Sequence, residues 1–161
     1  TGERFLVRNI NLNISRNAFE AKINDNDSIF SFNFNNIDQI IINEKKYKNY
    51  FSNGDNRVYQ VIYNDKNFSL LKGFSVKLVT SSGNPMVNRS NDKYVKKREY
   101  FFRNVNDNLI ESFRLNKRSL NKVIQNSPKG SATVLAYIEL NDLSYKNELD
   151  VVQILTFAFG N

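Results

Sequence analysis

The side chains that could carry chemistry in this chain are carboxylates, lysines, tyrosines and hydroxyls, because its 161 residues include neither histidine nor cysteine. Histidine is the usual general base near neutral pH and the commonest zinc ligand. Cysteine supplies thiolate nucleophiles, disulfides and thiolate metal sites. The composition therefore excludes histidine-dependent triads, thiol catalysis and thiolate metal centres.

Two short carboxylate groupings remain as candidates. Glu139 and Asp142 are spaced so that they could meet on one helix face, as the paired carboxylates of a hydrolase do, although a solvated face explains the spacing equally well. Asp25-Asn26-Asp27 resembles the start of an EF-hand calcium loop. That loop requires glycine at its sixth position and glutamate at its twelfth, where this chain has Phe30 and Asn36. We therefore expect a turn there, and no metal or other cofactor in the protein.

Basic residues are concentrated in one part of the chain. The formal net charge is +7, and residues 93–129 alone contain ten Lys and Arg against three Asp and Glu. Residues 130–161 are acidic instead, with one Lys against four Asp and Glu. A local excess of this kind can face phosphates, anionic lipid head groups or the chain's own acidic C-terminal segment. We predict a basic interaction surface made of Lys93, Lys96, Lys97, Arg98, Arg103, Arg114, Lys117 and Arg118.

Aromatic residues interleave with these charges in the segment 93–103, a mixture that suits single-stranded nucleic acid or another polyanion. The other interpretation is an ordinary amphipathic strand whose rings belong to the core. Rings and charges do not separate between the two sides of the strand, because Tyr94, Lys96 and Arg98 would share one side with Tyr100. The aromatic signature of RNA-binding sheets is absent. Binding of nucleic acid is therefore the weaker expectation.

Alternating apolar and polar residues predict antiparallel strands through the first 115 residues. Phe30, Phe32 and Phe34 would form one buried aromatic face of a hairpin that turns at residues 24–27. The segment 81–92, which contains glycine and proline, is predicted to be a long loop. The predicted strands cover residues 17–23, 28–34, 37–43, 46–51, 57–63, 68–72, 75–80, 93–103 and 109–115, and one or two edge strands are expected within residues 1–14, with a slip near Asn9.

After Leu115 the apolar period changes to about three and a half residues, which predicts helices. Asn116, Ser131 and Asn147 are placed to cap three of them, over residues 117–125, 132–140 and 147–159. The fold class predicted from these elements is α+β, with an antiparallel, curved or barrel-like sheet at about residues 4–115 capped by three short C-terminal helices. A chain of this length builds one core, so we expect a single domain at 1–161, with a β-rich part at 1–115 and a helical cap at 116–161. The longest nearly apolar run, residues 151–159, is too short for a membrane span.

Five segments occur in an order that carries a resemblance to a known group. They are Asn17-Ala18-Phe19 with Glu20, VYQVIYNDKNFSLLKGFSVKLV at 58–79, KYVKKREYFF at 93–102, LNKRSLNKVI at 115–124 and AYIELNDLSYKNELDVVQIL at 136–155. In this order they resemble the uncharacterised exported proteins of Bacteroidota, in particular of Flavobacteriia. The resemblance implies a periplasmic or outer-membrane-associated protein whose signal peptide has been removed. It implies no reaction.

The expected function is therefore that of a non-enzymatic envelope protein that binds another protein, as an accessory subunit of an outer-membrane complex such as a secretion translocon. The lack of catalytic residue types, the resemblance and the concentrated basic surface all favour this hypothesis. Binding of single-stranded nucleic acid or another polyanion is one alternative. A hydrolase with a carboxylate-based site is the other.

One modification site is also predicted. Asp27-Ser28-Ile29 resembles the short signal of Asp, Ser or Thr, and an apolar residue at which Bacteroidota attach O-glycans to exported proteins. At the tip of the predicted hairpin a glycan would disturb little packing. The alternative is that the Ser28 hydroxyl hydrogen-bonds within its own turn and carries no glycan. Ser28 is therefore a candidate for O-glycosylation.

Overall fold

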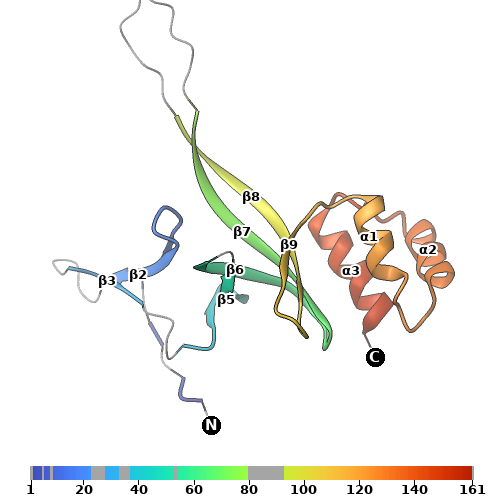
Figure 1. Ribbon diagram of the computed structural model, residues 1–161, viewed down its shortest axis with the longest axis horizontal. Coiled ribbons are helices and arrows are strands. Elements are labelled where there is room, and N and C mark those ends of the chain that lie inside the picture. The colour runs from blue at the N-terminus through green and yellow to red at the C-terminus, as the bar shows by residue number, and fades with distance from the viewer. Residues whose placement is uncertain are drawn as a thin grey trace, which may run out of the picture. The chain divides into compact units, whose positions relative to one another are not determined.

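The computed structural model of the chain describes residues 2–4, 6–7, 9–22, 28–32, 37–52, 54–79 and 93–160. Within these residues it has both strands and helices, with all the helices at the C-terminal end, so the predicted α+β class is confirmed (Figure 1). The elements are β1 (Ile10–Asn13), β2 (Ala18–Lys22), β3 (Ile29–Ser31), β4 (Ile40–Ile42), β5 (Lys45–Ser52), β6 (Asp55–Asn64), β7 (Phe68–Val79), β8 (Lys93–Asn104), β9 (Ile110–Phe113), α1 (Lys117–Ile124), α2 (Ser131–Leu140) and α3 (Glu148–Phe159).

The strands form two antiparallel sheets. One has the order β1-β2-β3, and the other has the order β4-β5-β6-β7-β8-β9. Consecutive strands are neighbours in both, as hairpin connections require. Of the two predicted shapes, curved or barrel-like, the barrel-like one is not formed, because β4 and β9 are the two outer strands of an open sheet in the described part of the chain. Strands β1 to β3, which the prediction counted in the same sheet, pair with one another instead.

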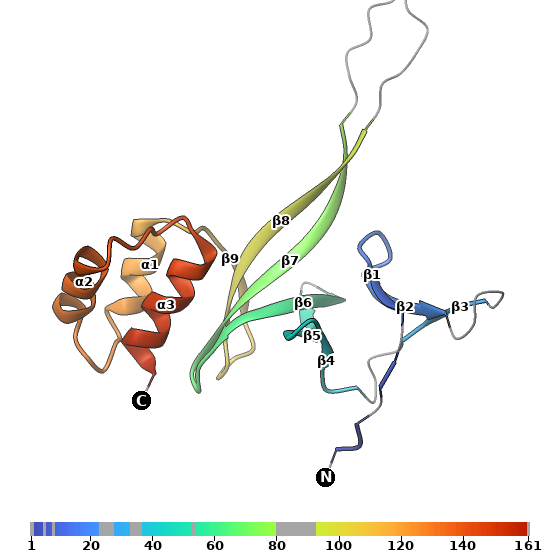
Figure 2. The same ribbon diagram turned by 180° about the vertical axis from the view of Figure 1, so that it is seen from behind.

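Strand β7 replaces two predicted strands. The sequence predicts a break at Gly73 between segments 68–72 and 75–80, but β7 runs without interruption from Phe68 to Val79. Because β7 is an inner strand with β6 and β8 on its two sides, the ladder holds the glycine in an extended conformation. The carbonyl of Phe74 also accepts a hydrogen bond of 3.3 Å from Arg57 Nη2. Figure 2 shows β7 and β8 side by side as a long twisted ribbon.

The chain divides into two compact units. Unit 1 comprises Thr1–Gln60 and Gly73–Arg98, and unit 2 comprises Val61–Lys72 and Glu99–Asn161. Strands β6, β7 and β8 therefore contribute residues to both units. The expectation of a single domain stays a prediction.

Unit 1 contains a small aromatic cluster and one asparagine that joins its two sheets. The ring of Phe19, which is fully buried, meets Tyr47 edge to face with centroids 5.4 Å apart. Burial raises the pKa of the Tyr47 hydroxyl above its ordinary value. Asn17, at a positive φ that asparagine tolerates, donates to the Asn56 carbonyl and accepts from the Val58 amide, both at 3.0 Å. This side chain ties the start of β2 to the backbone of β6.

The predicted hairpin of unit 1 is present, but its aromatic face is not buried as expected. Strands β2 and β3 pair with Ala21 opposite Phe30, which confirms the hairpin. Phe30 is nevertheless 50% exposed, and Phe34 lies outside the described residues. Directly opposite residues share a sheet face, so Phe30 covers the small Ala21 side chain from an outer strand. An outer strand has a neighbour on one side only, which leaves the other flank of the ring in solvent.

The main hydrophobic core belongs to unit 2. Both views show the three helices packed together, and the first half of β7 packs against them through Phe68 and Leu70. The Phe68 ring stacks on Phe102 of β8 at 5.1 Å and meets Phe159 of α3 edge to face at 5.0 Å. The buried helix residues are Leu120, Ile124, Val134, Ile138, Val151, Ile154, Leu155 and Ala158.

Two of the three predicted helix caps are confirmed. Asn116 accepts from the Ser119 amide at 2.9 Å, and Asn147 accepts from the Leu149 amide at 2.8 Å. The predicted cap Ser131 is wrong, because Ser131 is already the first residue of α2 and Gly130 occupies the cap position. Gly130 has a φ of 79°, a conformation that favours glycine, so the turn ends and α2 begins one residue earlier than predicted.

The core makes a direct prediction about α3. Leu155 is 1% exposed, so Leu155→Ala should lower the free energy of unfolding by about 2–5 kcal/mol through lost burial and a residual cavity. Urea denaturation of the purified chain measures this change. Leu109, which is 54% exposed in the same unit, is the matched control, and Leu109→Ala should change stability by less than about 0.5 kcal/mol. Equal small effects of both variants would show that α3 does not pack into this core.

Candidate functional site

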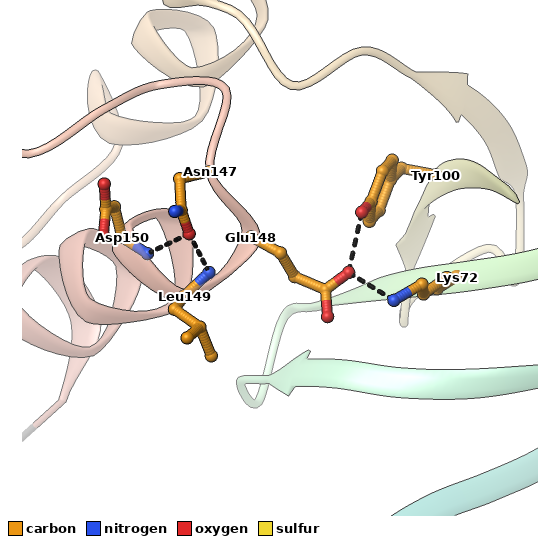
Figure 3. A network of polar contacts seen from close by, with 6 residues as sticks. All are labelled: Lys72, Tyr100, Asn147, Glu148, Leu149 and Asp150. Carbon is orange, nitrogen blue, oxygen red and sulfur yellow. Dashed lines mark hydrogen bonds and ion pairs between the residues drawn. The ribbon is translucent and has the colours of Figure 1, made fainter.

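A polar network in unit 2 brings together a lysine, a tyrosine and a carboxylate, three of the four side-chain types that remain available for chemistry. Lys72 lies in β7, Tyr100 in β8 and Glu148 at the first position of α3. The Lys72 ammonium donates to Glu148 Oε2 at 2.6 Å, and the Tyr100 hydroxyl donates to the same oxygen at 2.7 Å (Figure 3). The ammonium also lies 5.9 Å from the centroid of the Tyr100 ring. The three groups therefore form one charge-assisted cluster.

Local structure explains the position of the carboxylate. Asn147 caps α3, and Glu148 and Asp150 in its first turn lie where the positive end of the helix dipole favours negative charge. Lys72 is only 8% exposed, and Glu148 supplies the opposite charge that a buried ammonium needs.

The geometry of this network suits a structural tether, which holds α3 against β7 and β8, better than a catalytic site. A reacting lysine or tyrosine must present its nitrogen or oxygen to a substrate. Here the Lys72 ammonium and the Tyr100 hydroxyl both turn toward Glu148 instead (Figure 3). The contacts join the start of α3 to β7 and β8 within unit 2. We therefore assign the network a structural role.

The carboxylates singled out from the sequence lie in solvent. Glu139 and Asp142 are both exposed where α2 ends, and the Asp142 amide donates to the Glu139 carbonyl at 3.3 Å. The segment 25–27 lies outside the described residues. In the part of the chain that the structure describes, no group of three or more Asp and Glu side chains could hold a metal ion.

The eight predicted basic residues are divided between the two units. Lys93, Lys96, Lys97 and Arg98 are consecutive or nearly consecutive positions of β8 in unit 1, and all four are exposed. The other four belong to unit 2. They are Arg103 on β8, Arg114 after β9, and Lys117 and Arg118 in α1.

Two of the four unit 2 members, Arg103 and Lys117, contact their own unit. Arg103 is half-buried, and its Nη2 donates to Asn108 Oδ1. The Lys117 ammonium lies 6.0 Å from the centroid of the Tyr145 ring. Burial, and then the nearby Glu139 carboxylate, raise the pKa of Tyr145, so its hydroxyl stays neutral beside that cation.

The unit 1 members form part of a different feature, which we call the distal arm. It consists of residues 75–79 of β7 and 93–98 of β8, and it contains five Lys and Arg and no Asp or Glu. It also carries five exposed apolar or aromatic side chains with exposed fractions between 37% and 77%. These are Val76, Leu78, Val79, Tyr94 and Val95.

Both sides of the distal arm are open. Successive side chains of a strand point to opposite faces, so the adjacent pairs Leu78–Val79 and Tyr94–Val95 place exposed apolar groups on both faces. The β8 half of this surface is predicted from the sequence by its run of basic residues. The β7 half, with Val76, Lys77 and Leu78, is not, because alternation predicts an ordinary strand there. The absence of acidic residues from both halves was the signal that could have revealed it.

Ser28, the predicted modification site, directly precedes β3 and is exposed. Its neighbour Asp27 and the predicted loop at 81–92 lie outside the described residues. The hydroxyl of Ser28 is accessible, and its glycosylation stays a prediction.

Comparison with known proteins returns no family model, curated protein or solved structure that matches this chain. None of the helices in the described ranges combines the length and the apolar character needed to cross a membrane.

The structural role of the network predicts energetic coupling. Lys72→Met and Glu148→Gln should each lower the free energy of unfolding by about 1–3 kcal/mol, because each removes one partner of a charge-assisted hydrogen bond. In the double variant the loss should be smaller than the sum by about 0.5–3 kcal/mol. Urea denaturation of the four proteins measures this cycle.

The exposed pair of Lys48 and Asp38, 3.2 Å apart in unit 1, is the control for the network. Asp38→Asn should change stability by no more than about 1 kcal/mol. Strictly additive effects of the Lys72 and Glu148 substitutions would contradict the assignment of a tether.

Proposed function

We propose that this protein is a non-enzymatic protein-binding module of the cell envelope, and that the distal arm is its binding surface. The observation that carries the proposal is the exposure of five apolar side chains beside five cations, with no acidic residue among them. Grouped exposed apolar side chains mark interaction sites more often than scattered ones do. Their burial by a partner supplies affinity, and the cations supply orientation.

The composition of the distal arm favours a protein over a nucleic acid. Single-stranded nucleic acid gains affinity from aromatic platforms and from cations. Tyr94 is the one aromatic residue among positions 75–79 and 93–98, whereas four exposed side chains are aliphatic. Aliphatic groups gain little from phosphates and bases but fill an apolar pocket on a protein. Tyrosine is also among the residues that most often dominate protein interfaces.

The proposal extends to a place in the cell. The resemblance of five segments to exported Bacteroidota proteins supports the periplasm or the inner face of the outer membrane. A binding module there would serve as an accessory subunit of an outer-membrane complex such as a secretion translocon. The lack of histidine and cysteine, and the engagement of Lys72 and Tyr100 with Glu148, support a non-enzymatic role.

Site-specific photo-cross-linking in the native host tests the proposal. A photo-reactive amino acid at position 95, in the distal arm, should cross-link to an envelope protein. The same amino acid at position 109, which is equally open to solvent in unit 2, should give no such product. Adding Leu78→Ser and Tyr94→Ser should reduce the cross-link at position 95 by about tenfold or more, because two exposed anchors are lost.

Three outcomes would count against the proposal. Cross-links at position 109 with none at position 95 would place the binding surface elsewhere. Cross-links that survive Leu78→Ser with Tyr94→Ser would show that the apolar side chains do not bind. The purified protein could also bind single-stranded DNA in a salt-dependent way and lose this binding in the same double variant. That result would indicate that the distal arm binds a polyanion and not a protein.

A further inference from the structure

A second exposed apolar feature lies in unit 2, where α2 passes into α3. Leu140, the last residue of α2, is 86% exposed, and Leu149, the second residue of α3, is 76% exposed. A connection of residues 141–147 brings the end of α2 to the start of α3. We call residues 139–150 the α2–α3 end. Figure 3 shows Leu149 pointing away from Lys72 and Tyr100.

The connection holds this end in an ordered turn. The Leu143 amide donates to the Ile138 carbonyl at 3.0 Å, and the Ser144 amide donates to Asp150 Oδ2 at 2.9 Å. The side chain of Asn147 caps the first turn of α3. The two leucines are therefore presented from a backbone that is already ordered, which lowers the entropic cost of docking on them.

The charge of the α2–α3 end is opposite to that of the distal arm. Residues 139–150 contain four Asp and Glu against one Lys, and three carboxylates remain once Glu148 is paired with Lys72, whereas the distal arm contains five Lys and Arg and no acid. The C-terminal end of α2 adds partial negative charge beside Leu140 and the N-terminal end of α3 adds partial positive charge beside Leu149, so the carboxylates and not the helix ends make this surface acidic. One surface is thus apolar and basic, and the other is apolar and acidic.

We infer that the distal arm of one copy of this chain docks on the α2–α3 end of a second copy. This inference rests on the proposed function and names its partner. The attraction between the two charged surfaces orients the copies, and burial of Tyr94 and Leu78 against Leu140 and Leu149 stabilises the contact.

The contact is heterologous, because it joins two different surfaces. A copy whose distal arm is bound still has a free α2–α3 end, and a copy whose α2–α3 end is bound still has a free distal arm. Heterologous contacts build rings when the rotation closes and open filaments when it does not. Copies of this chain would therefore associate head to tail, in numbers that grow with concentration.

Mixing two defective variants tests this geometry. The arm variant carries Leu78→Ser with Tyr94→Ser, and the end variant carries Leu140→Ser with Leu149→Ser. All four side chains are exposed, so both variants should keep the melting temperature of the parent chain. Sedimentation velocity at increasing concentration should show growing oligomers for the parent chain and monomers for each variant alone. An equimolar mixture should form dimers and nothing larger, because one intact arm and one intact end remain.

Charge reversal gives the complementary result. An arm with Lys77→Glu, Lys93→Glu and Lys96→Glu has three carboxylates against two remaining cations, so this protein should not associate with itself. An end with Glu139→Lys and Asp142→Lys has three Lys against two acids, so this protein should not associate with itself either. In the mixture of these two proteins both kinds of contact join opposite charges again. It should therefore form oligomers beyond the dimer, and added salt should weaken them.

The outcomes separate this inference from the proposed function. The parent chain could stay monomeric at every concentration and still cross-link to a different envelope protein through position 95. That result would contradict the inference that the partner is a second copy, but it would agree with the protein-binding function. A monomer that binds vesicles of anionic lipid through Lys93 and Lys96 overturns both, in favour of a membrane surface. Oligomers that persist in the arm variant or the end variant also overturn the inference.

Discussion

The structure depends on the burial of the first half of one strand. In β7 the six residues from Phe68 to Gly73 are buried, and the last four are exposed. Phe68 lies between a ring of β8 and a ring of α3, and Leu70 belongs to the same core. The hydrophobic effect thus acts on one end of the strand only. The other end is held by its backbone ladder with β6 and β8 rather than by a core of its own.

This division of one strand between two environments links packing to the proposed function. The Lys72 ammonium stands near the boundary, where Glu148 and Tyr100 engage it. Beyond it, Val76, Leu78 and Val79 continue the apolar composition of β7 with no core to enter. Exposed apolar side chains do not stabilise the free protein. A partner that buries them would gain the free energy of removing their apolar surface from water. Positive charges on the same segment oppose association of two arms with each other and favour an acidic surface.

Local patterns in the sequence predicted much of the fold. Asn116 and Asn147 cap helices where the apolar period changes, because capping depends on residues only two or three positions away. The features that depend on distant partners were missed. Gly73 remains in a strand because β6 and β8 flank it, and Phe30 is exposed because β3 is an outer strand. The ion pair between Lys72 and Glu148 joins residues 76 positions apart, so no local sequence pattern predicts it.

The candidate binding surface was likewise found in part. The run of basic residues in β8 is visible in the sequence, but alternation alone does not say whether Val76, Leu78 and Val79 are buried or exposed. Arg103, Arg114, Lys117 and Arg118 lie close in sequence to that run, yet they belong to unit 2. The charges were counted along the chain, whereas the division into compact units falls within β8, between Arg98 and Glu99, and leaves Arg103 in unit 2.

The most direct measurement is amide hydrogen exchange of the protein in its native envelope assembly and as the isolated monomer. If the distal arm is the binding surface, the amides of residues 75–79 and 93–98 exchange more slowly in the assembly, while those of residues 68–72 are protected in both states. Equal exchange of the distal arm in the two states, with new protection confined to other segments, would contradict the account.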